Sequence, residues 1–304
     1  MNIFLENVNL NSNSGPNYFA QKLVKYLSFR GVTFDSSSKS NVKLTFIESL
    51  NQKPHLPMIQ RLDGIYFNAN FDCNKMNLNI KRTYENSKGV IFQTNFNKEL
   101  IFNWFGAHDN YRIINNGSDL LHINDLEKNS DIIEKFSSFE NVWSCAAHWH
   151  KFKRLNENIQ YFLNFSTKND CLVIAGSGDI ERINHPRIFY VGNLNTNQLL
   201  TLFKISKYFI HLAYLDHCPN VVIDARSCGC QIICSSSGGT KEIAGSNAIV
   251  IKEEEWDYSF LKATEPPIMD YNKKINNGID SELSMLKVSK KYLQFLKDVG
   301  NEFS

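Results

Sequence analysis

The stretch from Tyr208 to Ile243 constrains the fold more than any other part of the chain. It reads YFIHLAYLDHCPNVVIDARSCGCQIICSSSGGTKEI. The apolar run Tyr208–Leu212 predicts a buried strand, and Val221–Cys228 has helical spacing just after Pro219, a residue that the first turn of a helix tolerates. Cys230–Cys234 predicts a second strand, which a glycine loop connects to another helix. The predicted order is strand, loop, helix, strand, glycine loop, helix.

Two carboxylates and two groups of backbone amides are expected at one end of this unit. Asp216 follows the first strand, and Asp224 lies about one turn into the next helix. Open α/β sheets hold ligands at the carboxyl ends of their strands. The amides of Asn220 and Val221, and those around Gly238-Gly239, can cradle a phosphate. Carboxylates can accept hydrogen bonds from sugar hydroxyls, so their position beside phosphate-binding amides suits a nucleotide-sugar. The alternative is an ordinary doubly wound module whose carboxylates are only solvated.

These residues resemble the donor-binding half of glycosyltransferase family 4, retaining enzymes of the group 1 type with the GT-B fold. Asp216 and Asp224 fall on the family's two motif glutamates at the correct spacing, and the Gly-Gly loop and Glu242 follow in order. Both glutamates are aspartates here, and Ala213 stands where a serine is common. The resemblance implies that Asp216 holds donor-sugar hydroxyls, that Asp224 binds the ribose, and that Gly238, Gly239 and Glu242 belong to the donor site.

A basic segment follows a predicted strand at Asn141–Ala147 and leads into a predicted helix at Asn156–Asn164. The family keeps a basic pair here that neutralises the donor diphosphate. Lys153 matches the lysine of that pair, whereas His150 replaces the arginine. The resemblance therefore implies that Lys153 acts with Asp216 in catalysis and that His150 contacts the donor; a solvated helix start is the alternative.

The amino-terminal part of the chain offers weaker candidates. A predicted strand, Asn2–Val8, runs through a polar loop ending near Gly15 into an amphipathic helix, Tyr18–Phe29. This resembles the family's loop whose glycine lets the backbone approach donor phosphates and acceptor, although a plain strand-to-helix turn has the same pattern. Arg61 and Asp63 are expected either to contact the sugar or acceptor weakly or to form a structural ion pair.

The repeated alternation of strands and helices predicts an α/β protein with parallel sheets. The resemblance implies the GT-B fold, with two Rossmann-like domains facing a cleft. The expected parts are an acceptor-side domain at residues 1–138, a nucleotide-sugar-binding domain at 139–280, and a carboxyl-terminal helix at 281–304 that crosses back. Gly176-Ser177-Gly178-Asp179 lacks the third glycine of a dinucleotide fingerprint, which argues against a nicotinamide-dependent oxidoreductase.

Composition narrows the partners and the compartment. The chain has 304 residues and a formal charge of +2, so it lacks the basic footprint of a nucleic-acid-binding protein. No apolar run approaches the roughly 20 residues of a membrane span, and the amino end does not resemble a secretory signal. The seven cysteines have no paired CxxC spacing, which predicts reduced thiols, no metal site and a cytoplasmic protein. The abundance of Asn, Lys and Ile is compatible with an AT-rich genome, which suggests a bacterium or a virus-infected host cell. A peripheral position at a membrane stays open. Glu253–Glu255 is expected to be a solvated face.

The expected function is transfer of a sugar from a UDP-, GDP- or other nucleotide-diphosphate sugar to a hydroxyl of a glycan, a lipid-linked acceptor or a protein glycan, as in polysaccharide biosynthesis. No cofactor or metal is required, because helix-start amides and Lys153 would carry the charge of the leaving diphosphate. A monomer or weak homodimer is expected. The alternatives are a catalytically weak nucleotide-sugar-binding module and a nucleotide-sugar epimerase of the same fold.

Overall fold

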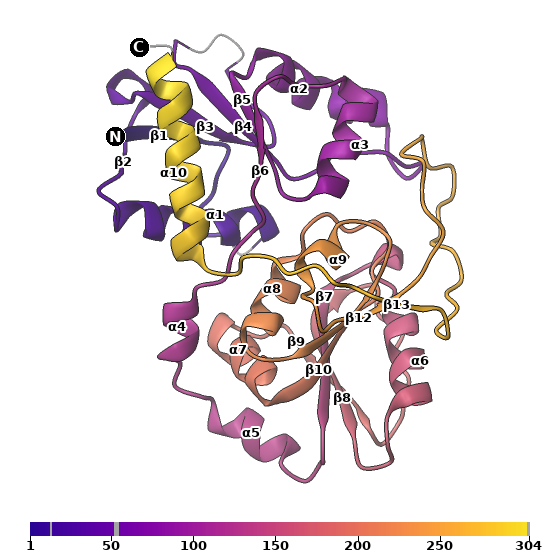
Figure 1. Cartoon of the computed structure of the whole chain (residues 1–304). Coiled ribbons are helices and arrows are strands. Elements are labelled where there is room, and N and C mark those ends of the chain that lie inside the picture. Colours follow the sequence, from indigo (N-terminus) through magenta and orange to yellow (C-terminus); the bar gives the residue numbers. More distant parts are fainter. Residues whose placement is uncertain (13, 52–54, 303–304) are drawn as a thin grey trace. The chain divides into compact units, whose positions relative to one another are not determined.

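A computed structural model describes residues 1–12, 14–51 and 55–302, which form two compact units (Figure 1). Unit 1 comprises the described residues of Met1–Gly117, Trp256–Thr264 and Glu282–Ser304. Unit 2 comprises Ser118–Glu255 and Glu265–Ser281. The chain therefore returns to unit 1 twice after entering unit 2.

Unit 1 is a parallel sheet with helices. Its strands are β1 (Asn2–Glu6), β2 (Thr33–Phe34), β3 (Val42–Phe46), β4 (Met58–Leu62), β5 (Gly89–Phe92) and β6 (Tyr111–Ile113), in the order β2-β1-β3-β4-β5-β6. Its helices are α1 (Gly15–Ser28), the 3-10 helix η1 (Ser37–Lys39), α2 (Cys73–Asn86), α3 (Asn95–Phe105) and α10 (Met285–Glu302). Each described pairing is parallel. β3, β4 and β5 are buried along their whole length, as is typical of parallel strands covered on both faces.

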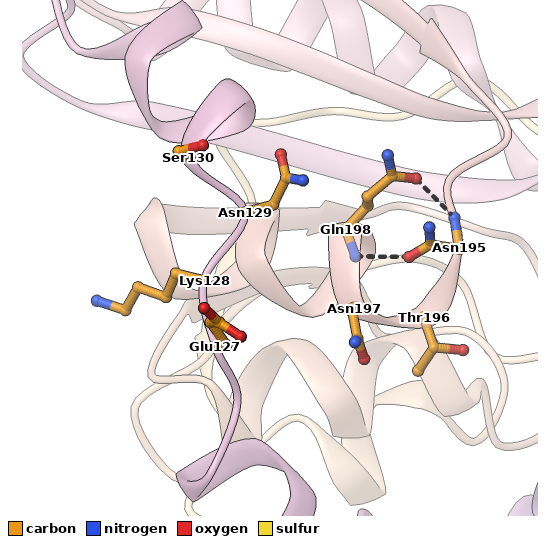
Figure 2. Close-up of a pocket in the computed structure, with 8 residues that line it drawn as sticks. All are labelled: Glu127, Lys128, Asn129, Ser130, Asn195, Thr196, Asn197 and Gln198. Carbon is orange, nitrogen blue, oxygen red and sulfur yellow. Dashed lines mark hydrogen bonds between the residues drawn. The ribbon is translucent and has the colours of Figure 1, made fainter.

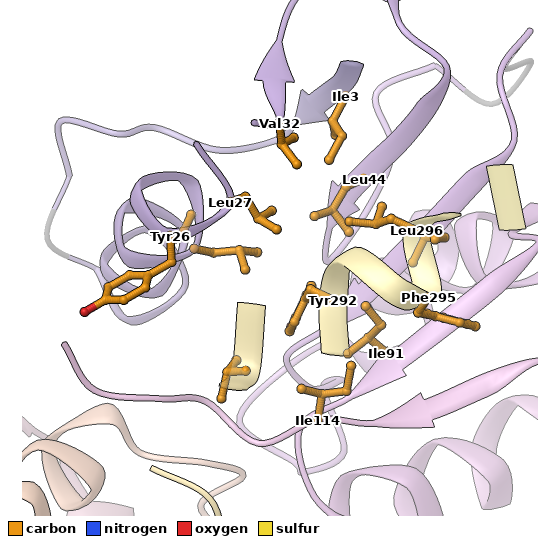
Figure 3. Packing of buried hydrophobic residues seen from close by; sticks show 14 of the residues in the cluster. Ile3, Tyr26, Leu27, Val32, Leu44, Ile91, Ile114, Tyr292, Phe295 and Leu296 are labelled. Carbon is orange, nitrogen blue, oxygen red and sulfur yellow. The ribbon is translucent and has the colours of Figure 1, made fainter. Parts of the chain in front are cut away.

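Helices α1 and α10 pack together in the hydrophobic core of unit 1 (Figure 3). The rings of Phe19 in α1 and Tyr292 in α10 lie 5.8 Å apart. Val288, Tyr292 and Phe295 follow helical spacing, so α10 presents one buried apolar face. The final helix was expected from residue 281 but begins at Met285, where the Ser284 hydroxyl accepts from the N–H of Leu286 at 3.2 Å.

A segment that the sequence did not mark, Trp256–Thr264, belongs to unit 1 through aromatic packing. The rings of Phe67 and Trp256 lie 4.9 Å apart, and the indole N–H of Trp104 donates to the carbonyl of Tyr258 at 2.8 Å. The N–H of Leu261 donates to the carbonyl of Phe67 at 2.9 Å. Local periodicity misses this arrangement because its contacts join residues far apart in sequence.

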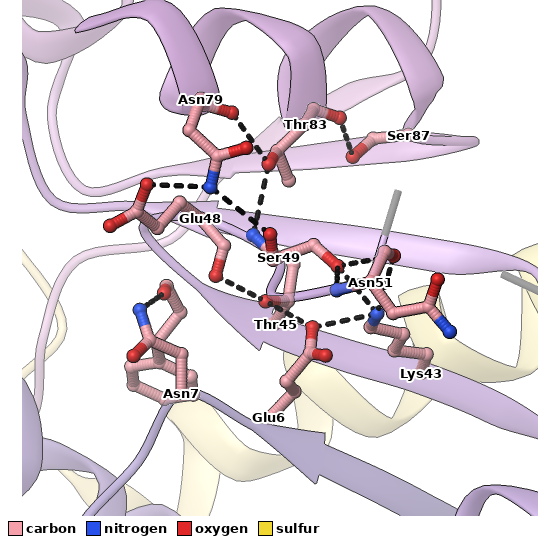
Figure 4. A network of polar contacts seen from close by, with 11 residues as sticks. Glu6, Asn7, Lys43, Thr45, Glu48, Ser49, Asn51, Asn79, Thr83 and Ser87 are labelled. Atoms are coloured by element: carbon pink, nitrogen blue, oxygen red, sulfur yellow. Dashed lines mark hydrogen bonds and ion pairs between the residues drawn. The ribbon is translucent and has the colours of Figure 1, made fainter. Parts of the chain in front are cut away.

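Unit 1 also contains a buried ion pair between adjacent strands (Figure 4). Lys43 Nζ lies 2.6 Å from Glu6 Oε2, and both side chains are under one tenth exposed. The hydroxyl of Thr45 donates to the same carboxylate at 3.1 Å, and Lys43 donates to the Ser49 hydroxyl at 2.6 Å. A buried charge is tolerated only with such partners.

Unit 2 has a seven-stranded sheet in the order β13-β12-β11-β10-β7-β8-β9. Its strands are β7 (Val142–Trp149), β8 (Cys171–Gly178), β9 (Ile188–Gly192), β10 (Ser206–His211), β11 (Gln231–Ser235), β12 (Ile249–Ile251) and β13 (Lys274–Asn276). Its helices are α4 (Leu120–Asn124), α5 (Ser130–Phe136), the 3-10 helix η2 (Lys151–Lys153), α6 (Leu155–Phe165), α7 (Thr196–Ile205), α8 (Asn220–Ser227) and α9 (Thr240–Ile243). The pairing is parallel except at β13, which runs antiparallel to β12.

Residues 118–138, expected in the first domain, lie in unit 2. The His122 ring contacts Asn197 Oδ1 at 3.0 Å, and the N–H of Asn129 donates to the Thr201 hydroxyl at 3.1 Å. Lys204 donates to the carbonyl of Ile123. These bonds hold α4 and α5 on α7, so the observed division between the units follows Gly117 rather than residue 138.

The seven cysteines all lie in the described part of the chain, where none forms a disulfide and only Cys228 is not fully buried. Every described helix is too short or too polar to cross a bilayer.

Candidate functional site

The sheet of unit 2 has a topological switch point between β7 and β10. From β7 the chain proceeds through β8 and β9 on one side, and from β10 through β11 and β12 on the other. Ligands of open α/β sheets bind at the carboxyl ends of the strands at such a point. The segments that follow β7 and β10 carry Lys153 and Asp216, respectively.

Lys153 and Asp216 meet there. Lys153 Nζ forms an ion pair with Asp216 Oδ2, and the two side chains are 22% and 16% exposed. The same oxygen lies 2.9 Å from His211 Nε2, and Asp216 Oδ1 accepts from the N–H of His217 at 3.0 Å. Burial alone would raise the pKa of Asp216, but Lys153 and His211 hold it well below its usual range. The carboxylate is therefore charged and still reachable from solvent.

His211, the last residue of β10, is a site residue that the sequence analysis missed. It is 2% exposed, and burial lowers its pKa despite the neighbouring Asp216, so the ring is neutral at pH 7. A neutral imidazole that donates from Nε2 satisfies the carboxylate of Asp216 without adding charge. The available signal was a histidine at the carboxyl end of an otherwise apolar strand.

The glycine loop packs directly on the backbone of Asp216. The N–H of Gly239 donates to the carbonyl of Asp216 at 2.8 Å. Gly238 has a φ of +77°, and a β-carbon there would lie 2.6 Å from that carbonyl oxygen. Only glycine fits this position. Glu242, the remaining predicted residue of this segment, is half-buried in α9.

Asp224 is more enclosed than Asp216. It lies in α8 and is 4% exposed, and its Oδ1 accepts from the hydroxyl of Ser118 at 2.5 Å. Asn220 and Val221 form the partly exposed first turn of the same helix. Unit 2 thus contains all three residues, and the ribose contact of Asp224 stays a prediction.

His150 is exposed beside the Lys153–Asp216 pair. Partial burial of its ring, together with the charge of Lys153, lowers the pKa of His150. Its imidazole is therefore neutral at pH 7 and can donate a hydrogen bond but supplies no second positive charge.

The predicted residues of the amino-terminal part lie in unit 1. Gly15 is exposed at the first position of α1. Arg61 is fully buried, pairs with Asp63, and donates to the Tyr292 hydroxyl at 3.1 Å and to Asn116 Oδ1 at 2.7 Å. This burial favours the structural ion pair for Arg61, whereas Asp63 keeps 17% of its side chain exposed.

Glu253 corrects the expectation of a solvated acidic face. Its side chain is 5% exposed, and its carboxylate accepts from both terminal nitrogens of Arg154, at 2.7 and 3.0 Å. Glu254 and Glu255 are exposed, as expected. Sequence alone did not show this pair because its members are 99 positions apart.

A surface cavity of about 660 Å³ lies elsewhere on unit 2 (Figure 2). Residues 127–130 and 195–198 line it, between the α4–α5 connection and the start of α7. It contains none of the predicted site residues, so the charged groups at the switch point remain the better candidate. Among the described residues, no cluster of His, Cys, Asp and Glu is arranged to hold a metal ion.

Comparison with known proteins fits this geometry. Residues 150–262 match the family model "Glycosyl transferases group 1". The resemblance to group 1 glycosyltransferases is confirmed. This segment contains the switch-point residues and the glycine loop. No curated protein sequence matches the chain.

Solved structures of low sequence identity share the fold. Sucrose-phosphate synthase from Thermosynechococcus elongatus matches with a TM-score of 0.67 and 12% identity over 100% of this chain and 93% of that one. Anabaena HepE, in complex with UDP and glucose, matches with a TM-score of 0.68 and 13% identity over 98% of this chain and 100% of that one. A glycosyltransferase from Rickettsia africae matches with a TM-score of 0.64 and 15% identity over 98% of each chain. The predicted α/β fold of the GT-B type, with two Rossmann-like sheets, is confirmed.

His217, which lies within the segment that matches the family model, predicts that the stability of the protein depends on pH. Burial lowers the pKa of His217 to about 4, below its ordinary value of 6.5. The unfolded chain therefore binds a proton near pH 6.5 that the folded chain binds only near pH 4. We expect the free energy of unfolding to fall as pH decreases from about 6.5 to about 4. Urea titrations should show a shallower fall for His217→Gln, and an unchanged slope would contradict the assignment.

Proposed function

We propose that the chain is a retaining glycosyltransferase of family 4 that moves a sugar from a nucleotide-diphosphate sugar to an acceptor hydroxyl. The observation that supports this most is the meeting of Lys153 and Asp216 at the switch point, directly beside Gly238-Gly239. A cation, a carboxylate and the backbone of a glycine loop at one sheet edge match the three parts of such a donor, namely its diphosphate, its sugar hydroxyls and its leaving oxygen.

In the proposed reaction, the bond between the sugar and the diphosphate breaks while the acceptor oxygen bonds to the sugar carbon on the same face. Lys153 and the backbone amide of Gly238 stabilise the charge that develops on the leaving diphosphate. Asp216 holds sugar hydroxyls, and the leaving phosphate takes the acceptor's proton. Attack on the departing face retains the anomeric configuration, and no side-chain base is needed.

The ion pair prepares the site before the donor arrives. Because Asp216 is charged and Lys153 lies against it, each group is held within reach of an incoming donor. Donor oxygens can then replace the ion-pair contact of Lys153. No metal is required in this scheme, so transfer should continue in EDTA.

A donor panel tests the proposal. UDP-sugars come first, since a structure of the same fold contains UDP and glucose; GDP-sugars and others follow. Thermal shift identifies the nucleotide that binds, and release of nucleotide diphosphate with glycan or lipid-linked acceptors measures transfer. Proton NMR of the product reports the anomeric configuration. An inverted product would overturn the retaining mechanism, and donor conversion without acceptor would instead indicate an epimerase.

Asp216→Asn should lower the transfer rate about 10- to 100-fold while nucleotide affinity changes less. The reason is that a hydrogen bond to a charged group contributes about 1.5–3 kcal/mol, and Asp216 is proposed to contact the sugar rather than the nucleotide. Initial rates and calorimetric nucleotide titrations separate the two. Equal losses of both would assign Asp216 to binding alone. Asp216→Glu is an informative second variant, because faster turnover would show that the shorter aspartate side chain limits the rate of transfer in this protein.

A nucleotide-sugar-binding module without turnover is the second candidate. The neutral ring of His150 favours it, because the site then has no second positive charge beside Lys153 to stabilise a leaving diphosphate. If a nucleotide diphosphate stabilises the protein while no donor is consumed, this function replaces the first.

A further inference from the structure

Arg154 has an unfavourable backbone conformation next to Lys153. It lies between η2 and α6 with φ +52° and ψ +52°, in the left-handed region. A residue with a β-carbon pays roughly 1–2 kcal/mol for this conformation. Such a residue persists only where its surroundings hold it, and the contacts of its side chain show what does so.

The guanidinium of Arg154 joins separate segments of unit 2. It binds both carboxylate oxygens of Glu253, and it donates to the carbonyls of Leu212 at 3.3 Å and Pro267 at 2.6 Å. It also stacks over the ring of Tyr214 at 5.0 Å. The side chain has no exposed surface. Arg154 thus ties the start of α6 to the segment that leads from β10 to Asp216.

Glu253 extends the connection to the glycine loop. Its carboxylate accepts from the hydroxyl of Ser235, the last residue of β11, and its N–H donates to the hydroxyl of Ser236 at 2.8 Å. The hydroxyls of Ser235 and Ser237 lie 2.7 Å apart, immediately before Gly238. The pair therefore contacts all three segments that carry the proposed site.

Two backbone bonds complete the linkage. The N–H of Tyr214 donates to the carbonyl of Phe152, and the N–H of Gly239 donates to the carbonyl of Asp216, each at 2.8 Å. These bonds set how the segment of Lys153, the segment of Asp216 and the glycine loop lie against one another. Arg154 and Glu253 act on this arrangement through these segments, because no bond among the described residues joins either of them to Lys153 Nζ or to the Asp216 carboxylate.

We propose that Arg154 and Glu253 are positioning residues that hold Lys153, Asp216 and the glycine loop in register for the transfer. The inference rests on the proposed function. Desolvation makes a buried ion pair a poor source of stability, and apolar residues of similar size often replace one at no loss. Directional bonds to several segments are what an apolar pair cannot reproduce. A misplacement of about 1 Å can cost roughly 100-fold in rate.

The double variant Arg154→Met/Glu253→Leu separates positioning from stability. It leaves no unpaired buried charge, so the protein should fold and melt close to the wild type. We expect kcat per folded molecule to fall about 10- to 100-fold. Hydrogen exchange should become about tenfold faster at the amides of Tyr214 and Gly239, because their partners are no longer held. Arg154→Lys keeps the positive charge but not the planar pair of N–H donors of the guanidinium. Its kcat and its amide exchange rates should lie between those of the double variant and the wild type.

A matched control is a second buried ion pair, Glu6 with Lys43 in unit 1 (Figure 4). Glu6→Leu/Lys43→Met should leave both kcat and the exchange of the two amides unchanged. Wild-type kcat and wild-type exchange in the Arg154/Glu253 variant would overturn the positioning role. If wild-type protein transfers no sugar, the proposed function fails, yet the exchange rates still decide whether the pair holds the three segments.

Discussion

Replacing Lys153 with alanine should reduce the transfer rate about 100- to 1,000-fold and weaken binding of the nucleotide diphosphate. Its ammonium is the charged group that reaches the switch point beside Asp216, and partial exposure leaves it available to a donor. A preorganised donor that stabilises developing charge contributes on this scale. Burial of the neighbouring carboxylate increases the effect, because Asp216 would be left without its cation. Steady-state rates and calorimetric nucleotide titrations measure both losses.

A matched control uses Lys151, a lysine of the same 3-10 helix. Its side chain is 59% exposed and pairs with Glu265 on the surface. Surface pairs of this kind contribute little to stability, so Lys151→Ala should keep the wild-type rate. If Lys153→Ala turned over donor as fast as Lys151→Ala does, the proposed role of Lys153 would be wrong.

The supersecondary structure followed from the sequence because its signals are local. The unit predicted from Tyr208 to Ile243 appears as β10, α8, β11 and α9, with ends shifted by a few residues. Apolar runs and helical spacing record which face of an element is buried, so they report the element itself. Asp216 and Lys153 could likewise be placed, since both directly follow strands whose carboxyl ends share one edge of the sheet.

Contacts between distant segments could not be predicted in this way. Glu253 had the sequence context of a solvated acid, but it is buried because its carboxylate pairs with Arg154, which lies far away in the chain. His211 lies in an apolar strand, and its position there is equally typical of a residue buried in the core, so the pattern did not mark it as a site residue. The segment Trp256–Thr264 joins unit 1 through ring packing that has no period. Each of these features depends on which elements become neighbours, and composition and spacing do not record that.

Substituting Gly238 with valine should be the most damaging single change in the glycine loop. At φ +77° a β-branched residue is strained by about 1–2 kcal/mol, and its β-carbon would lie 2.6 and 2.8 Å from the carbonyl oxygen and nitrogen of Asp216. Backbone atoms cannot turn aside as a flexible side chain can, so overpacking should add about 1–3 kcal/mol. We expect unit 2 to lose about 3 kcal/mol of unfolding free energy and transfer to become undetectable, as urea titration and rate measurements would show.

Gly229→Ala separates strain from collision in this prediction. Gly229 has a φ of +100°, but a β-carbon there would meet no atom within 4 Å. Its substitution should therefore cost only the conformational term, about 1 kcal/mol, and leave the rate of transfer unchanged. Gly238→Ala brings the same β-carbon collision but has no branched side chain, so its stability should lie between those of Gly229→Ala and Gly238→Val. It should still lose transfer, because any movement of the loop also shifts the Gly239 amide from the carbonyl of Asp216. Equal stability and equal activity for Gly229→Ala and Gly238→Ala would show that the loop does not need its close approach to Asp216.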